Sequence, residues 1–151
     1  MSIKAAFADD PEALLGSYRL DEQVGYLLRL AGQRHAAIFQ AHTLEGLTAT
    51  QFATLVRLAE NGACSQNQLG RLAAMDIATI KGVVDRLRQK GLVCTAPSSD
   101  DRRRSIVSLT DEGTRMLGAM IEAGRAITEE TLAPLNPSER RSLLKLLRKL
   151  G

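Results

Sequence analysis

Three consecutive arginines, Arg102, Arg103 and Arg104, stand in a polar stretch between two short apolar segments. Guanidinium groups on an exposed loop bind phosphate oxygens and suit a narrow minor groove, where negative potential is concentrated. A helical stretch just before them carries four more cations, Lys81, Arg86, Arg88 and Lys90. Residues 71–108 hold eight Lys or Arg against four Asp or Glu, whereas the rest of the chain holds twelve against thirteen. The basic charge is therefore confined to one quarter of the chain, as an electrostatic surface for nucleic acid requires.

The elements that must position these cations are a helix-turn-helix and a β-hairpin. Segments 92–96 and 105–109 alternate in polarity or carry β-branched residues and flank a polar loop, which predicts a hairpin with the arginines at its tip. Three helix starts precede the hairpin, with the capping residues Thr48, Ser65 and Asp76. Gln follows three positions after each of the first two, which predicts a capping box at both. A short turn around Met75 joins the last two helices, so the spacing predicts a winged helix-turn-helix.

Helices with apolar stripes flank this central part on both sides. Residues 21–42 follow helical spacing, a helix restarts at Thr110 and runs to near Pro134, and a leucine-rich helix follows Asn136. These helices carry more apolar surface than one small domain needs, so we expect a two-fold homodimer. The single domain 1–151 is expected to divide into an N-terminal dimerisation helix region over 1–46, a winged helix-turn-helix over 47–115 and C-terminal dimerisation helices over 116–151.

The composition of the 151 residues predicts one cytoplasmic domain that is mainly α with a small β-hairpin. Hydrophobic residues make up 44% of the chain, enough for a core, and Leu and Ala dominate over β-branched residues. Cys64 and Cys94 lie far apart without a CxxC pair, which favours packing residues in a reducing compartment over a disulfide or a zinc site. No signal peptide or membrane-length apolar run is evident. We expect no membrane contact, no metal and no cofactor.

The helix from Asp76 to Lys90 is expected to enter the major groove, where base edges carry a distinguishing pattern of donors and acceptors. Small residues in its first half permit close approach, and Arg86 would point toward phosphate. An amphipathic helix with a solvated charged face is the alternative. The residues predicted to contact DNA are Ser65, Gln66, Asn67, Ile77, Ala78, Thr79, Lys81, Gly82, Arg86, Asp101, Arg102, Arg103 and Arg104.

Two parts of this set have alternatives of their own. The start of the helix at 65–67 would give backbone N–H groups to phosphate, or it would serve as a simple cap. The arginine loop would bind DNA, or it would face solvent with ion pairs worth only about 0–1 kcal/mol. Acids lie only on its N-terminal side, which favours binding.

The ordered set of segments 79–87, 90–93, 101–103 and 109–113 resembles the multiple-antibiotic-resistance regulator (MarR) family of bacterial transcription factors. The resemblance covers essentially the whole chain and departs from the family pattern at Gly82, where a bulkier residue is common. It implies a homodimer on a palindromic operator, with repression relieved by a small ligand. It also implies that Arg103 enters the minor groove, with Asp101 paired to it or to a neighbouring arginine.

The first helix, over 21–29 and 33–35, is similar to that of members governing the breakdown of aromatic acids or their CoA thioesters. A small aromatic carboxylate or its CoA ester is therefore the effector that the resemblance implies. An Arg beside a His on an apolar helix could receive a carboxylate, although such a His is often a core or interface residue. The candidate effector residues are Arg19, Tyr26, Arg29, Arg34, His35, Phe39, Phe52 and Met116.

The leading hypothesis is thus a ligand-responsive transcriptional repressor. The alternative is a winged-helix architectural or protein-interaction module without sequence-specific regulation. An enzyme is not expected, because the chain has two His, no Gly-rich phosphate loop and no nucleophile motif. A cysteine sensor is disfavoured because the relatives that use one place it in the first helix, where this chain has none.

Overall fold

The computed structural model describes residues 10–42 and 46–151, so the first nine residues, where no leader is expected, lie outside the description. The chain forms two compact units, which divide after Ala37. The first unit holds α1 (Pro11–Leu15), a 3-10 turn at Leu20–Glu22 and the start of α2 (Val24–His42). Asp10 caps α1 by accepting from the Glu12 N–H. None of the described residues up to Ala37 is buried.

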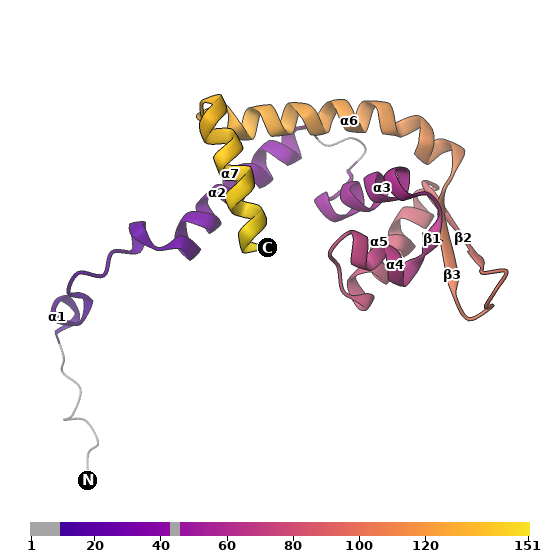
Figure 1. Cartoon of the computed structure of the whole chain (residues 1–151), viewed down its shortest axis with the longest axis horizontal. Helices are drawn as coiled ribbons and strands as arrows, with labels where there is room; N and C mark the ends of the chain where they lie inside the picture. The colour runs from indigo at the N-terminus through magenta and orange to yellow at the C-terminus, as the bar shows by residue number, and fades with distance from the viewer. Residues whose placement is uncertain (1–9, 43–45) are drawn as a thin grey trace, which may run out of the picture. The chain divides into compact units, whose positions relative to one another are not determined.

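The second unit is built around a trihelical cluster and a small sheet (Figure 1). The helices are α3 (Ala49–Asn61), α4 (Gln66–Leu72) and α5 (Ile77–Gln89), and the strands are β1 (Cys64–Ser65), β2 (Val93–Pro97) and β3 (Ser105–Leu109). Thr48 closes the predicted capping box with Gln51. Ser65 accepts from the Gln68 N–H without the reciprocal bond, so only half of the second predicted box forms.

The predicted hairpin is confirmed, but the sheet has a third strand that the sequence did not predict. The strand order is β1-β3-β2 and both pairings are antiparallel. Val93 is opposite Leu109 at one end of the hairpin, and Pro97 is opposite Ser105 at the other. Cys64 and Ser65 pair with Val107 and Ile106. A two-residue strand is too short to show an alternating pattern, and only its pairing with β3 defines it.

One continuous core joins the three helices, the sheet and the long helix α6 (Asp111–Leu132). Leu55, Leu69 and Ile80 are fully buried in it, together with Val107 from the central strand and Met120 from α6. Fully burying each such side chain contributes about 1.5–3 kcal/mol. The core therefore fixes α5 and the hairpin as parts of one rigid head.

The start of α6 is locked onto the connection between α5 and β2. The Thr110 hydroxyl donates to the Gly91 carbonyl at 2.6 Å and accepts from the Gly113 N–H at 3.1 Å. Gly91 has φ +76°, the left-handed conformation that glycine adopts freely. A Cβ at Gly113 would overlap the carbonyl oxygen of Leu92, so glycine is required for this close approach.

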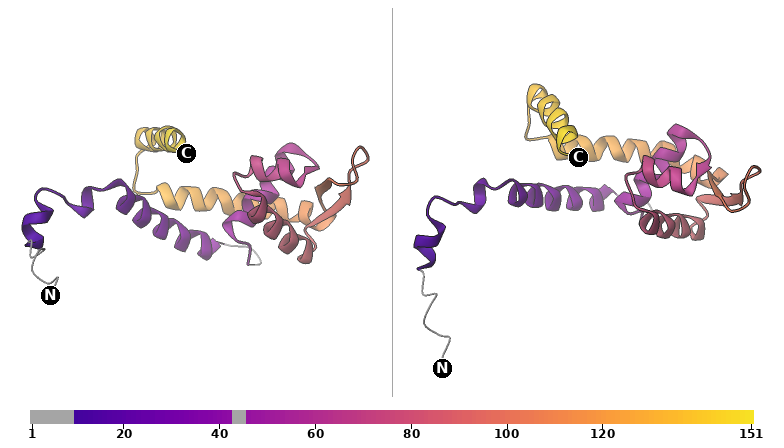
Figure 2. Two further views of the ribbon diagram at one scale, coloured as in Figure 1. Left: turned by 90° about the horizontal axis from the view of Figure 1, so that it is seen from below. Right: turned by 60° about the horizontal axis from the view of Figure 1, so that its bottom comes forward.

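The C-terminal helix α7 (Pro137–Leu150) begins at a capping box formed by Asn136 and Glu139. It leaves the end of α6 farthest from the sheet (Figures 1 and 2). Arg140 donates to Glu129 of α6 at 2.9 Å. No residue of α7 is buried, and four of its leucines are exposed, Leu144, Leu146, Leu147 and Leu150. No helix in the described part of the chain is long and apolar enough to cross a membrane.

The two cysteines have different environments. Cys64 is buried, and burial raises the pKa of its thiol, partly offset by a hydrogen bond from Asn61. The prediction that Cys94 is a packing residue is wrong, because Cys94 is exposed. Successive side chains of a strand face opposite sides, and on β2 it is the neighbouring Val93 that enters the core. The Cys94 sulfur lies 3.3 Å from the Ser108 hydroxyl on the outer face.

Candidate nucleic-acid interface

Helix α5 has one buried and one exposed face. Ile80, Val83, Val84 and Leu87 are buried at helical spacing and hold the helix against the core. Asp76 fixes its start, since Oδ1 accepts from the Thr79 N–H at 2.7 Å. That hydrogen bond lowers the pKa of the Asp76 carboxyl. All six residues of α5 predicted to contact DNA are exposed, namely Ile77, Ala78, Thr79, Lys81, Gly82 and Arg86.

The cations of α5 differ in how far they are already paired. Lys81 lies 3.8 Å from Asp85, a long contact, and its side chain is 70% exposed. Arg88 is directed away from the first turn, since it donates to Asp85 at 3.4 Å and to the Thr95 hydroxyl of β2 at 3.2 Å. Arg86 makes no side-chain hydrogen bond or ion pair with the described part of the chain. Arg86 and Lys81 are thus available for phosphate, whereas Arg88 ties α5 to the hairpin.

The loop between β2 and β3, residues 98–104, is here called the wing tip. Asp101 Oδ1 accepts from the backbone N–H of Arg103 at 3.0 Å, and the Asp101 carbonyl accepts from the Arg104 N–H at 3.0 Å. The predicted pairing of Asp101 with a guanidinium is therefore not seen, because the carboxylate holds the backbone of the loop instead. The side chains of Arg102, Arg103 and Arg104 are exposed and have no ion-pair partner among the described residues. The wing-tip backbone is ordered while its charges are left for a ligand.

The three predicted residues at the start of α4 are not equivalent. Ser65 is 5% exposed and its hydroxyl is used as the helix cap, which favours the capping alternative for its side chain. Gln66 is half-buried and Asn67 is exposed. Asn67 also lines a groove of about 550 Å³ between α4 and the start of α5, together with Arg71 and Ile77.

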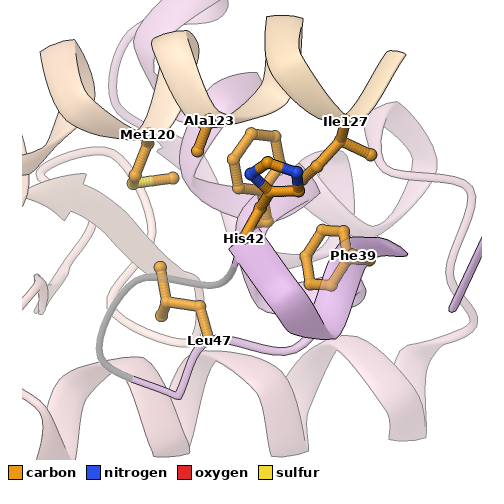
Figure 3. Close-up of a pocket in the computed structure, with 7 residues that line it drawn as sticks. Phe39, His42, Leu47, Met120, Ala123 and Ile127 are labelled. Atoms are coloured by element: carbon orange, nitrogen blue, oxygen red, sulfur yellow. The ribbon is translucent and has the colours of Figure 1, made fainter. Parts of the chain in front are cut away.

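A second site lies where the end of α2 meets α3 and α6 (Figure 3). A small apolar cavity there is lined by seven residues, Phe39, His42, Leu47, Phe52, Met120, Ala123 and Ile127. The Phe39 and Phe52 rings meet edge to face, with centroids 5.9 Å apart. His42 Nε2 lies 2.6 Å from Glu130 Oε2. The cavity volume is about 10 Å³, room for about one water molecule.

On its other side, Phe52 borders an open groove of about 520 Å³ between α3 and α6. The groove is also lined by Val56, Ile121 and Gly124, with Arg125 at its edge. A Cβ at Gly124 would lie 2.9 Å from Phe52 Cζ, so this glycine makes room for the ring. Among the residues that the structure describes, Phe52 alone lines both the cavity and the groove.

Of the candidate effector residues, the structure brings Phe39 and Phe52 together. Met116 does not line the cavity and packs against the main core instead. The other five, Arg19, Tyr26, Arg29, Arg34 and His35, belong to the N-terminal unit. Within that unit the Arg29 guanidinium lies 5.4 Å from the centre of the Tyr26 ring, and Arg19 donates to the carbonyls of Gly16 and Tyr18.

Sequence reasoning did not select His42, Met120 or Ile127 as cavity residues. The seven-residue spacing of Met120 and Ile127 marks one face of α6 but does not separate a cavity wall from ordinary core. His42 stands three positions after Phe39, about one helical turn, so the spacing alone could have placed both residues on the same face of the helix. In the described part of the chain, no cluster of His, Cys, Asp and Glu is suited to hold a metal ion.

Comparison with known proteins identifies the same architecture. A model described as the MarR family matches residues 47–105. The HTH-type transcriptional repressor NicR of Pseudomonas putida is 47% identical over 134 residues, which are 88% of this chain and 85% of NicR. A crystal structure of a probable transcriptional regulator from Pseudomonas aeruginosa is 51% identical, with a TM-score of 0.85, covering 88% of this chain and all of that one. BpsR of Bordetella bronchiseptica, whose DNA binding is regulated by 6-hydroxynicotinic acid, is 42% identical, with a TM-score of 0.84, covering 88% and 96%.

Proposed function

Because the chain belongs to the MarR family of transcriptional regulators, we propose that it represses transcription by binding a palindromic operator as a homodimer. A small aromatic acid would release it. The observation that carries the proposal is the wing tip, where the exposed side chains of Arg102, Arg103 and Arg104 have no ion-pair partner in the described part of the chain. Beside it, Arg88 binds Thr95 and ties the wing to α5. One rigid head thus presents an uncovered helix face and an uncovered cationic loop.

In this proposal α5 enters the major groove and the wing tip reaches the adjacent minor groove. The exposed residues from Ile77 to Gly82 face base edges, and Arg86 contacts phosphate. Arg103 enters the minor groove, with Arg102 and Arg104 on the flanking phosphates. Gln66 and Asn67 lie at the start of α4, where backbone N–H groups suit a phosphate, and Ser65 supports them as the cap.

The dimer is proposed from the apolar side chains that the chain leaves exposed outside 47–115. In the N-terminal region 1–46 they include Leu27 and Leu28, and in the C-terminal region 116–151 they include Ile121 and four leucines of α7. A symmetric partner would cover both sets. A two-fold dimer places the half-sites about 10 base pairs apart, centre to centre. Such a repressor has no catalytic role and acts in the cytoplasm, with the chromosome.

The effector is proposed to be a small aromatic carboxylate or its CoA thioester. Its support is the apolar cavity between Phe39 and Phe52, with His42 beside it, and the control of the relative BpsR by 6-hydroxynicotinic acid. The cavity in its present form is too small for an aromatic ring. A ligand must therefore displace the side chains that separate α2, α3 and α6, and that displacement would reorient the DNA-binding head.

The test is a binding titration with duplexes covering the promoter region of the gene itself, followed by footprinting. We expect protection of two symmetric half-sites and at least tenfold weaker operator binding for Arg103→Ala. Arg57→Ala is the matched control, because Arg57 is an exposed arginine of α3 already paired with Glu60 at 2.7 Å. Binding of Arg103→Ala equal to that of Arg57→Ala would reject the role of the wing. Equal affinity for random DNA would favour an architectural module instead.

A further inference from the structure

The first two turns of α5 hold only one of the side chains that usually read guanine and adenine. Guanine is read mainly by Arg or Lys, and adenine by Asn or Gln, because each can form two hydrogen bonds to its base. Residues 77–82 contain one such side chain, Lys81. The remaining exposed positions are Ile77, Ala78, Thr79 and Gly82. What this surface offers to a base pair is chiefly methyl groups.

Ile77 is the most prominent of these residues. It is the first residue of α5, and the residue is 68% exposed. The core does not need it, since the buried face of the helix begins at Ile80. Single exposed apolar side chains are ordinary on protein surfaces and need no function. This one, however, stands at the N-terminal end of the recognition helix, the part of a helix-turn-helix that meets base edges.

The surroundings of Ile77 are mainly apolar. Gly70, Met75, Ala78 and Ile80 line the groove beside Ile77, and the polar residues that share this groove are Asn67, Arg71 and Asp76. The nearby Asp76 carboxylate is engaged by the Thr79 N–H. An apolar group on a base edge would therefore meet mainly apolar surface at Ile77, whereas the long side-chain donors of this groove, Asn67 and Arg71, belong to α4.

We propose that Ile77 reads a thymine in each operator half-site through its 5-methyl group, with Ala78 and Thr79 extending the apolar contact. Thymine is the one base that presents a methyl group in the major groove. This inference rests on the proposed function, because it concerns the bases that the same helix contacts. The operator half-site then contains an A·T pair that faces the first turn of α5, and Lys81 contacts a guanine that faces the next turn.

The experiment replaces thymine by deoxyuridine, which keeps the pairing and removes only the methyl group. The probe is a duplex selected by the wild-type protein from a random double-stranded library, with each half-site thymine replaced in turn. We expect one thymine per half-site whose replacement weakens wild-type binding about fourfold, the factor for one buried methyl group. Ile77→Val retains branched methyl groups and should remain sensitive. Ile77→Ala should bind the thymine and uracil duplexes equally.

The outcomes distinguish failure of the proposed sequence-specific DNA binding from failure of thymine reading by Ile77. If no sequence is enriched from the library, the proposed sequence-specific function fails and this inference fails with it. If a palindrome is enriched but no uracil replacement matters, the function stands and thymine reading by α5 is overturned. Should Ile77→Ala lose affinity while remaining as sensitive to uracil as wild type, another residue reads the methyl group and the role of Ile77 is rejected. Uracil placed outside the half-sites is the control for general effects on the duplex.

Discussion

Replacing Gly82 by Ala should raise the stability of the protein and lower its affinity for operator DNA. Gly82 lies in the interior of α5, where glycine costs about 1 kcal/mol relative to Ala. A Cβ built at Gly82 meets no described atom within 4 Å, so Ala introduces no clash within the chain. The free energy of unfolding should rise by about 1 kcal/mol per chain, and Tm by roughly 2–4 °C for a chain of this length. The same methyl group would stand between α5 and the base edges, so we expect operator affinity to fall at least tenfold.

The assay pairs thermal unfolding with operator titration for two variants. Gly118→Ala is the matched control, since Gly118 is an exposed glycine inside α6 that also has nothing within 4 Å of a built Cβ. It should gain similar stability and keep wild-type operator affinity. A Gly82→Ala protein that is more stable and binds as tightly as wild type would show that α5 does not approach the bases closely at this position. A lower Tm would contradict the observation that a Cβ at Gly82 meets no neighbouring atom.

Three further changes test other parts of the molecule. Gly113→Ala should lower the free energy of unfolding by about 1–3 kcal/mol in chemical denaturation, because the added Cβ overlaps the Leu92 carbonyl; an unchanged midpoint would contradict that packing. The pKa of Asp76 is lowered in the folded state, so its contribution is complete above about pH 4 and is lost as the pH falls through the folded pKa. Thermal unfolding between pH 2 and 6 should therefore depend less on pH in Asp76→Asn than in wild type, and parallel curves would exclude this role. If 6-hydroxynicotinic acid releases the operator, His42→Ala should need at least fivefold more of it, whereas an unshifted release curve would remove His42 from the effector site.

The local signals of this chain were sufficient for most of the fold. Capping side chains at Thr48, Asp76 and Asn136 each satisfy a backbone N–H three residues on, so the helix starts could be predicted from spacing alone. The long first helix begins at Val24, three residues later than its apolar pattern suggests, because residues 20–22 form a 3-10 turn. Such a difference depends on hydrogen-bond geometry at the helix end, to which residue spacing is insensitive.

Two features that sequence reasoning missed, strand β1 and the cavity, depend on distant segments. Strand β1 exists because β3 comes beside Cys64 some forty residues later in the chain. The cavity is formed by residues from α2, α3 and α6, and nothing in any one segment distinguishes Ile127 as a wall. Asp101 binds Arg103 through the backbone N–H and not through the guanidinium, a choice that the sequence does not indicate. The cationic residues themselves were predictable, because exposed charge needs no partner in the fold.

Helix α6 has a consequence for how insertions would act on this repressor. Its first turn is anchored to the head through Thr110 and Gly113, and farther along it supplies Met120 and Ile127 to the cavity. An α-helix advances by about 1.5 Å and turns by about 100° with each residue. One residue added between Gly113 and Met120 would therefore swing the anchored end almost a third of a revolution relative to the cavity. The rotation about the axis of α6, more than the length of α6, therefore sets the direction of α5 relative to the cavity.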